Sequence, residues 1–288
     1  MQNFFSYSPS VLKKMPQRPQ HSNKGTFGRV LVVGGSPCMS GAAYFSAKAA
    51  YRTGAGLVQI LTHEDNRIIL QTQLPEAILS TYSESNFNED EISETIEKAD
   101  VIVVGVGLGQ SQLAKKLLSL VLAVADAPII ADADALNMIA KTTDALDCVS
   151  APLIITPHMM EMARICHTNI AEIISNPVDF TVDYATKNSL ICVLKDHETI
   201  AYDGTADSGI YVNKSGNSGM ATGGSGDVLT GIIAALIAQG LPLFDAATLG
   251  IYIHGLAGDA AAEELGEYSV MASDIIEHIS TVIKDCRD

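Results

Sequence analysis

Basic residues are scarce in this sequence of 288 residues. It has 18 lysines and arginines against 33 aspartates and glutamates, so the formal net charge at pH 7 is −15. Such a negative field repels the phosphate backbone of nucleic acids and the surface of anionic membranes. We therefore expect no nucleic-acid partner, and a ligand that carries phosphate must be held by backbone dipoles and a few well-placed cations.

Cysteine pairs and long apolar runs are also missing. The five cysteines lie far apart and form no C-x-x-C motif, so they predict neither a disulfide framework nor a zinc knuckle and fit a reducing compartment. The longest apolar runs, such as Leu117 to Ala125, fall well short of the roughly 18 residues that span a bilayer. Residues 1–24 lack the apolar core of a signal peptide. We expect a cytoplasmic protein with no membrane partner.

The overall composition is that of a folded chain. Hydrophobic residues make up 47% of the sequence and the mean hydropathy is +0.21, which excludes a disordered or low-complexity chain. No linker, internal repeat or charge block divides the sequence. We expect a single domain over residues 1–288, with residues 1–24, which contain three prolines among polar residues, as an N-terminal arm.

Short apolar runs alternate with stretches of helical periodicity along the chain, which indicates an α/β fold with a mainly parallel sheet and helices on both faces. Strands are expected over 29–33, 57–61, 101–104, 129–130, 153–155 and 190–194, and helices from residue 41 and over 91–99, 113–124, 177–187, 228–238, 246–265 and 273–284. The runs 199–202 and 210–212 predict a small antiparallel addition at one edge. Ligands of such sheets bind outside the carboxyl ends of the strands, where the glycine turns fall.

The glycine-rich segment from Gly216 to Asp227 directly precedes an apolar helix. Its glycines permit close approach of the backbone, and the first turn of the helix offers unpaired N–H groups and a positive dipole end. We expect an anion-binding cradle here, formed by Gly223, Gly224, Ser225 and Gly226. The alternative is a surface loop with Asp227 as an ordinary N-cap.

Asp227 is the strongest candidate for a catalytic residue. A carboxylate beside a bound phosphate is repulsive unless it orients a metal or takes a proton from an attacking hydroxyl, and we favour the role of a base. No Gly-Lys-Ser/Thr follows the glycines, and the pattern is not a dinucleotide fingerprint.

Polar residues after other expected strands are weaker candidates. Lys195 either neutralises phosphate oxygens or extends from a strand end to solvent. Asp132 and Asp134 form a turn or approach magnesium, and we favour turn and hydrogen-bond roles because Mg²⁺ needs few protein ligands. Taken alone, His158 has the pattern of an ordinary loop histidine. Glu161 is of secondary interest, since it could equally cap or charge the first turn of a helix.

The stretch N-S-G-M-A-T-G-G-S-G-D-V-L at residues 217–229 resembles the signature of the NAD(P)H-hydrate dehydratases, a family of the ribokinase-like superfamily. Matching motifs occur in the family's order from about residue 18 onward, at 24–29, 34–36, 40–43, 105–109, 132–137, 156–158, 161, 195 and 199. The sequence departs from the family pattern at five residues, all in turns or flanks: Val106, Met159, Met160, Asp196 and Ser218. We expect these departures to affect loop shape and affinity.

This resemblance implies a ribokinase-like three-layer αβα sandwich and an activity. The enzyme would use ADP, or ATP, with Mg²⁺ to dehydrate the S epimer of the hydrated cofactors NADHX and NADPHX, which restores NADH and NADPH. It would phosphorylate the ring hydroxyl and eliminate phosphate. The resemblance also implies a homo-oligomer, a tetramer, and a separate NAD(P)HX epimerase.

The resemblance also implies site residues, carried over position by position. Asp227 would be the catalytic base. The hydrated dinucleotide would contact Ala42, Gly107, His158 and Asp227. The adenine nucleotide would contact Lys195, Asp196, His197, Glu198, Thr199 and Gly226. No protein side chain is assigned to a metal.

Two other functions compete with this one. A vitamin-precursor kinase of the same superfamily would phosphorylate an alcohol and stop there, although residues 24–28 and 156–158 resemble the dehydratases. A dinucleotide sensor would bind without turnover, and such a module has no use for Asp227 beside an anion cradle.

Overall fold

The structure is a computed structural model that describes residues 3–142, 144–205 and 208–284. In this part of the chain ten strands form one sheet, in the order β1-β10-β9-β8-β7-β6-β5-β2-β3-β4. The strands are β1 (Phe4–Phe5), β2 (Arg29–Val33), β3 (Leu57–His63), β4 (Ile78–Tyr82), β5 (Val101–Val104), β6 (Ile129–Ala131), β7 (Leu153–Ile155), β8 (Ile191–Leu194), β9 (Ile200–Tyr202) and β10 (Ile210–Val212).

Every pairing from β4 through β8 is parallel. Strand β9 is antiparallel to both of its neighbours, β8 and β10, which confirms the antiparallel addition expected over 199–202 and 210–212. The N-terminal arm extends this edge, because β1 pairs with β10 and the Tyr7 hydroxyl lies 2.9 Å from that of Thr248.

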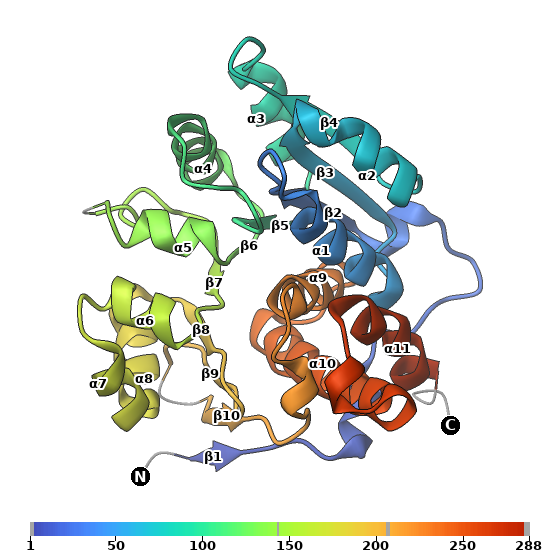
Figure 1. Ribbon diagram of the computed structural model, residues 1–288, viewed down its shortest axis with the longest axis vertical. Helices are drawn as coiled ribbons and strands as arrows, with labels where there is room; N and C mark the ends of the chain where they lie inside the picture. The colour runs from blue at the N-terminus through green and yellow to red at the C-terminus, as the bar shows by residue number, and fades with distance from the viewer. Residues whose placement is uncertain (1–2, 143, 206–207, 285–288) are drawn as a thin grey trace.

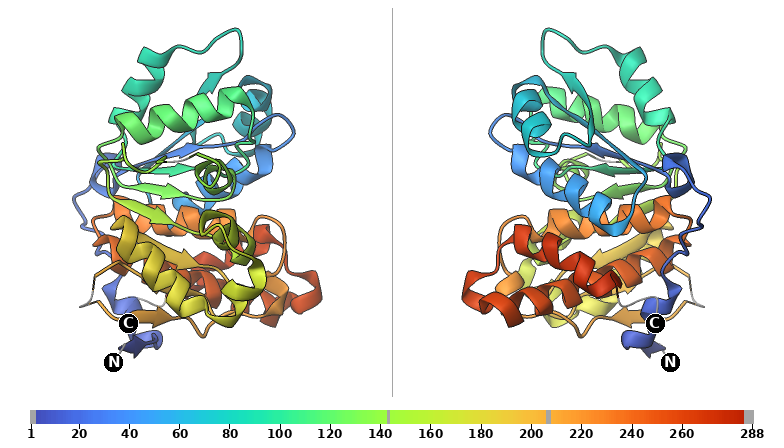
Figure 2. Two further views of the ribbon diagram at one scale, coloured as in Figure 1. Left: turned by 90° about the vertical axis from the view of Figure 1, so that its left-hand side faces the viewer. Right: turned by 90° about the vertical axis from the view of Figure 1, so that its right-hand side faces the viewer.

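Helices cover both faces of the sheet, so the expected three-layer arrangement is confirmed (Figures 1 and 2). They are α1 (Ser40–Thr53), α2 (Arg67–Gln73), α3 (Glu89–Glu97), α4 (Gln112–Val124), α5 (Asp134–Ile139), α6 (Met159–Ile165), α7 (Ile170–Ser175), α8 (Pro177–Asn188), α9 (Ser225–Ala238), α10 (Leu243–Leu265) and α11 (Ala272–Lys284). None of the described helices is both long and apolar enough to cross a membrane.

Alternating residues of each strand supply two separate cores. In β2, Val30 and Val32 belong to the core that contains α1, α9, α10 and α11, whereas Leu31 and Val33 belong to the core that contains α3, α4, α5 and α6. Successive side chains of a strand point to opposite faces. A parallel sheet that is covered on both faces therefore needs continuous apolar strands, as this sequence has.

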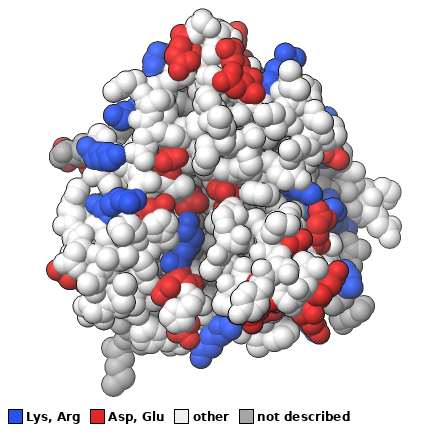
Figure 3. Space-filling view, viewed as in Figure 1, with Lys and Arg blue, Asp and Glu red and all other residues white. Residues whose placement is uncertain are grey.

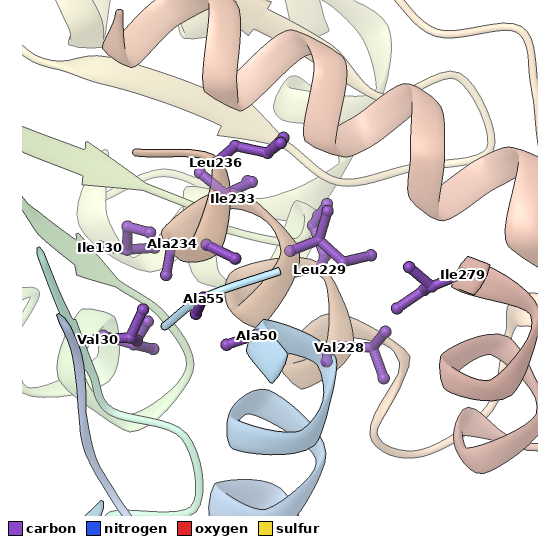
Figure 4. Close-up of a cluster of buried hydrophobic side chains, with 14 of the residues drawn as sticks. Val30, Ala50, Ala55, Ile130, Val228, Leu229, Ile233, Ala234, Leu236 and Ile279 are labelled. Carbon is purple, nitrogen blue, oxygen red and sulfur yellow. The ribbon is translucent and has the colours of Figure 1, made fainter. Parts of the chain in front are cut away.

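Helix α9 lies in the interior of its layer. Eleven of its 14 residues are buried, and Figure 4 shows Val228, Leu229 and Ile233 among side chains from the sheet, α1 and α11. A buried hydrogen bond of 3.1 Å also joins the hydroxyls of Ser46 on α1 and Thr230 on α9. A helix that is apolar on all sides is held by its surroundings, so the first turn of α9 has a fixed position.

The strand order changes direction at β2, which lies between β3 and β5. A hydrogen bond joins the turns that follow β2 and β5: the N–H of Gly35 donates to the carbonyl of Val106 over 2.9 Å. Ligands of open α/β sheets bind in the crevice at such a switch point. The fold thus directs attention to the carboxyl ends of β2 and of the strands from β5 to β8.

Candidate active site

Four candidate site residues lie within three positions of the ends of neighbouring parallel strands. Gly107 follows β5, Asp132 follows β6, His158 follows β7 and Lys195 follows β8. An isolated parallel bridge between His158 and Lys195 extends the pairing of β7 and β8 beyond their ends. Because carboxyl ends of parallel strands share one edge of the sheet, these residues form one row. Figure 3 shows basic and acidic side chains side by side in the middle of one face.

The first turn of α9 begins without a side-chain cap. Its N-cap is Gly224, with a left-handed φ of 93°, and a Cβ at this position would lie 2.6 Å from the Phe45 ring. Among the described residues, no hydrogen bond uses the backbone N–H of Gly223, Gly226 or Asp227. These groups are free donors at the positive end of a helix dipole, which is the arrangement of an anion cradle.

Packing within the protein requires glycine at position 224 but not at position 223. A Cβ on Gly223 would meet nothing within 4 Å, and the residue is exposed. Nothing in the described part of the protein therefore demands glycine at this position. Open space beside free N–H groups leaves room for a ligand to reach the backbone.

Asp227 is not the N-cap, so the alternative of an ordinary cap is wrong. It occupies the third position of α9, and within the described residues its carboxylate accepts no hydrogen bond. Burial, and next the charge of Asp132, raise the pKa of Asp227 to about 7, although Lys195 acts in the opposite direction. A carboxylate with a pKa near neutrality and free oxygens is suited to accept a proton.

Lys195 forms a buried ion pair beside this carboxylate. Its Nζ lies 2.6 Å from Oδ1 of Asp132, and the two side chains are 18% and 2% exposed. Burial lowers the pKa of Lys195, but the charges of Asp132 and Glu161 outweigh it, so the ammonium group stays charged. The Nζ atom is 3.2 Å from the place of a Cβ on Gly226, which puts this cation against the cradle.

The two aspartates after β6 have different partners. The backbone reverses at Ala133, which has a φ of 49°. Asp134 accepts hydrogen bonds from the N–H of Gly109 at 2.8 Å and the side chain of Gln110 at 3.2 Å, which is the turn and hydrogen-bond role expected of it. Asp132 instead anchors Lys195. No three His, Cys, Asp or Glu residues of the described chain are grouped as metal ligands.

His158 and Glu161 begin helix α6 as a reciprocal cap. Nδ1 of His158 accepts from the N–H groups of Met160 and Glu161 at 3.0 and 3.3 Å, and the Glu161 carboxylate accepts from the N–H of His158 at 2.9 Å. Burial and Lys195 lower the pKa of His158. The ring is therefore neutral, with its proton on Nε2, and half of it is exposed. That Nε2–H can donate to a ligand.

Ala42 and Gly107 lie against each other at the switch point. A Cβ on Gly107 would be 2.8 Å from Cβ of Ala42 and 3.0 Å from the carbonyl oxygen of Met39. The turn after β5 therefore packs directly on the start of α1. Gly107 is buried and Ala42 is partly exposed, and neither side chain carries charge, as a contact surface for a flat ring requires.

The predicted nucleotide segment divides into two parts. Lys195 lies at the cradle with Gly226, whereas Asp196, His197 and Glu198 are exposed in the connection from β8 to β9. Asp196 contacts the ring of His197 at 3.0 Å and accepts from the Thr199 hydroxyl, through its carbonyl, at 3.1 Å. These contacts order the connection beside Lys195.

One residue at the site was not predicted. His254 of α10 places Nε2 3.2 Å from the hydroxyl of Ser225, in the first turn of α9. In the sequence it lies within the largely apolar helix expected over 246–265. A histidine in that largely apolar run was the signal that could have drawn attention to it.

Comparison with known proteins gives a consistent result. The family model described as NAD(P)H-hydrate dehydratase matches residues 30–281. A bifunctional NAD(P)H-hydrate repair enzyme of Moorella thermoacetica is 37% identical over 96% of this chain, which spans 53%, or about half, of that relative. An ADP-dependent (S)-NAD(P)H-hydrate dehydratase of Neisseria meningitidis is 37% identical over 90% of this chain and 84% of its own length.

Solved structures resemble the whole described fold. A ribokinase-like superfamily protein from Enterococcus faecalis has a TM-score of 0.88 at 31% identity, covering 99% of this chain and 97% of its own. An ADP/ATP-dependent NAD(P)H-hydrate dehydratase from Bacillus subtilis, co-crystallised with ATP/Mg²⁺, has a TM-score of 0.87 at 27% identity over 99% of both chains. A hydroxyethylthiazole kinase from Pyrococcus horikoshii, with a TM-score of 0.61 and 14% identity over 95% of this chain and 92% of its own, shares the fold alone.

Proposed function

The chain belongs to the NAD(P)H-hydrate dehydratase family, and on this premise we propose that it is an ADP-dependent hydro-lyase that converts (S)-NADHX and (S)-NADPHX to NADH and NADPH. The single observation that carries the proposal is the free carboxylate of Asp227 beside the free N–H groups of the cradle. A base next to an anion site is the minimal equipment for transfer of a phosphoryl group to a hydroxyl.

Asp227 performs the first step. Its carboxylate takes the proton of the ring hydroxyl as that oxygen attacks the terminal phosphorus of ADP, whose bond to the bridging oxygen breaks and releases AMP. The pKa of about 7 leaves a large fraction of the base deprotonated at neutral pH, yet makes it more basic than an ordinary aspartate. The hydroxyl thereby becomes a phosphate ester, which is a good leaving group.

The cradle stabilises the charge on the transferring group. The N–H groups of Gly223, Gly226 and Asp227 point from the start of α9, and the ammonium of Lys195 lies against the same turn. Such preorganised donors act where negative charge develops. The ring nitrogen then expels phosphate, and loss of a ring proton restores the dihydropyridine.

The residues present fit an adenine nucleotide with Mg²⁺. Free N–H groups, open space at Gly223 and a charged lysine suit a phosphate chain, in a protein whose overall charge is negative. Mg²⁺ would supply positive charge to the phosphate oxygens and needs few protein ligands. Oδ2 of Asp132, 3.7 Å from the Cβ place at Gly226, is a carboxylate oxygen beside the cradle that could hold it.

The proposal extends to the setting of the enzyme. It includes a preference for ADP over ATP, a cytoplasmic location, a homotetrameric state and a separate epimerase that interconverts the hydrate epimers. Bifunctional repair enzymes among the relatives support the link to an epimerase. Catalytic efficiency with ATP equal to that with ADP would contradict the nucleotide preference, and a monomer in sedimentation would contradict the tetramer.

The purified protein with NADHX, ADP and Mg²⁺ tests the activity. We expect the dihydropyridine absorbance to return, with release of phosphate and loss of one phosphoryl group from ADP for each hydrate. In a parallel reaction that supplies ATP and a hydroxymethyl-pyrimidine or thiazole alcohol in place of NADHX and ADP, accumulation of the phosphorylated alcohol would favour the kinase. Binding of NADHX without consumption of ADP or ATP would favour a sensor.

A further inference from the structure

His254 is a titratable group that the proposed mechanism does not use. It lies in the middle of α10, and its Nε2 is 3.2 Å from Oγ of Ser225. Ser225 is the first residue of α9 and is buried between the free N–H groups of the cradle. His254 is therefore one contact away from the atoms that would hold a phosphoryl group.

The imidazole of His254 is neutral. Burial, together with the charge of Lys195, lowers its pKa to about 4, while a hydrogen bond to the Ser225 backbone acts in the opposite direction. A neutral imidazole has one ring N–H and one ring lone pair, so the tautomer decides which partner donates. We assign the hydrogen to Nε2, which lies 3.2 Å from Oγ of Ser225 and in this tautomer donates to it.

This direction determines what the Ser225 hydroxyl can do. A hydroxyl has one hydrogen to donate and two lone pairs that accept. When the hydroxyl oxygen accepts from the ring, its own hydrogen stays available for another acceptor. In the first turn of α9 that acceptor can be an anion in the cradle.

Helix α10 also holds the other end of the glycine-rich segment. One turn and a half beyond His254, the Asp259 carboxylate accepts from the N–H of Gly216 at 2.9 Å and from the side chain of Asn217 at 3.0 Å. His254 and Asp259 of α10 thus contact both ends of residues 216–225. The helix serves as a support for the cradle.

We propose that His254 is a positioning residue for phosphoryl transfer: it holds Ser225 so that the serine hydroxyl donates to the anion bound at the start of α9. The inference rests on the proposed function for the identity of that anion, a terminal phosphate. It assigns to Ser225 a direct contact with the ligand, and to His254 an effect that acts only through Ser225.

A double-mutant cycle with a binding measurement tests this. His254→Leu and Ser225→Ala should each weaken the calorimetric affinity for ADP by roughly 10- to 100-fold, the effect of one lost hydrogen bond to a charged group. AMP, which lacks the transferable phosphoryl group, should bind each variant as it binds the wild type. The double variant should bind ADP no more weakly than Ser225→Ala alone, since both changes remove the same contact.

Further variants separate positioning from a structural role. His254→Gln keeps an N–H donor and should recover ADP affinity to within a few-fold of the wild type. His278→Leu is the matched control: it removes a histidine of the same layer, which contacts Glu264 at 3.0 Å, and should leave ADP affinity unchanged. If His254→Leu does not fold, His254→Phe replaces it: this variant keeps an aromatic ring, and the same loss of ADP affinity is expected.

Additive losses in the double variant, or equal losses for ADP and AMP, would overturn the proposal. So would a fall in the melting temperature of His254→Phe with unchanged ADP affinity. Conversion of NADHX by the wild type is measured beside these titrations. If the wild type did not convert NADHX, the proposed function would fail, while the difference between ADP and AMP would still decide the role of His254.

Discussion

Helices α6 and α9 begin at the same edge of the sheet, and each has an acidic residue at its third position. Glu161 of α6 accepts from the N–H of its N-cap, His158. The Asp227 carboxylate of α9 accepts no hydrogen bond from the described residues, and the N-cap of this helix is a glycine. Two equal sequence positions therefore serve different purposes: one carboxylate completes a helix end, and the other is kept free.

The difference concerns stability as well as chemistry. A carboxylate in the first turn of a helix gains about 0.3–1 kcal/mol from the dipole, and a capping contact adds about as much. Asp227 forgoes the capping contact and is partly buried beside Asp132, which raises its pKa. Its position weakens the fold at neutral pH, and we attribute the retained carboxylate to function.

The largest effect should come from Asp227→Asn. Because asparagine has the shape of aspartate but cannot take a proton, the single-turnover rate with both ligands saturating should fall by roughly 10²–10⁴-fold. Binding of ADP and NADHX should be nearly unchanged. A variant that turns over within a few-fold of the wild type would remove Asp227 from the mechanism.

The same pair of proteins should differ in how stability depends on pH. The folded state raises the Asp227 pKa from 3.8 to about 7, so it binds the proton more tightly than the unfolded chain does. This contribution is present at low pH and is lost as the pH rises toward 7. Relative to Asp227→Asn, the wild type should lose on the order of 2–4 kcal/mol of unfolding free energy between pH 4 and 7. Parallel stability curves in urea titrations would contradict a buried, free carboxylate.

Changing the neighbours of Asp227 should move its titration in opposite directions. Lys195 lowers the Asp227 pKa and Asp132 raises it. Lys195→Met should therefore move the acid limb of turnover to higher pH and also weaken ADP binding by roughly 10-fold, as expected for a lost charge-assisted contact. Asp132→Asn should move the limb to lower pH. Shifts in the same direction would mean that the ion pair acts on the fold rather than on the base.

Glu161→Ala should have the smallest effect on the rate. It removes the reciprocal cap of α6, so the free energy of unfolding should fall by about 1 kcal/mol, while turnover at a temperature where the variant is folded changes only a few-fold. Glu161→Gln, which can still accept from the His158 N–H, is the matched control and should restore stability. A large rate loss in Glu161→Ala with full stability would mean that both carboxylates serve the chemistry.

Much of the fold could be predicted from sequence because its long elements have clear periodicity. The parallel strands and the helices α1, α3, α4, α8, α9, α10 and α11 were expected near their observed bounds. Six short elements were not expected: β1, β4, α2, α5, α6 and α7. Their sequences lack a clear apolar run or a helical period, and they form because the neighbouring strands and helices position them.

The site was predictable where its residues are adjacent in sequence. The cradle and Asp227 lie within one segment, whereas Lys195 and Asp132 are 63 residues apart. Their ion pair depends on β6 and β8 lying on either side of β7, which periodicity does not determine. The contact between His254 and Ser225 depends in the same way on the packing of α10 against α9.

The pH dependence of single turnover at limiting NADHX tests the central claim most directly, because it reports the groups that titrate in the enzyme before the hydrate binds. The comparison of α6 with α9 predicts that the rate decreases as the pH falls, with a midpoint near pH 7. This acid limb should be absent from the residual activity of Asp227→Asn and unchanged in Glu161→Gln. A midpoint near 4, or a limb near 7 that persists in Asp227→Asn, would contradict the assignment of the free carboxylate as the base.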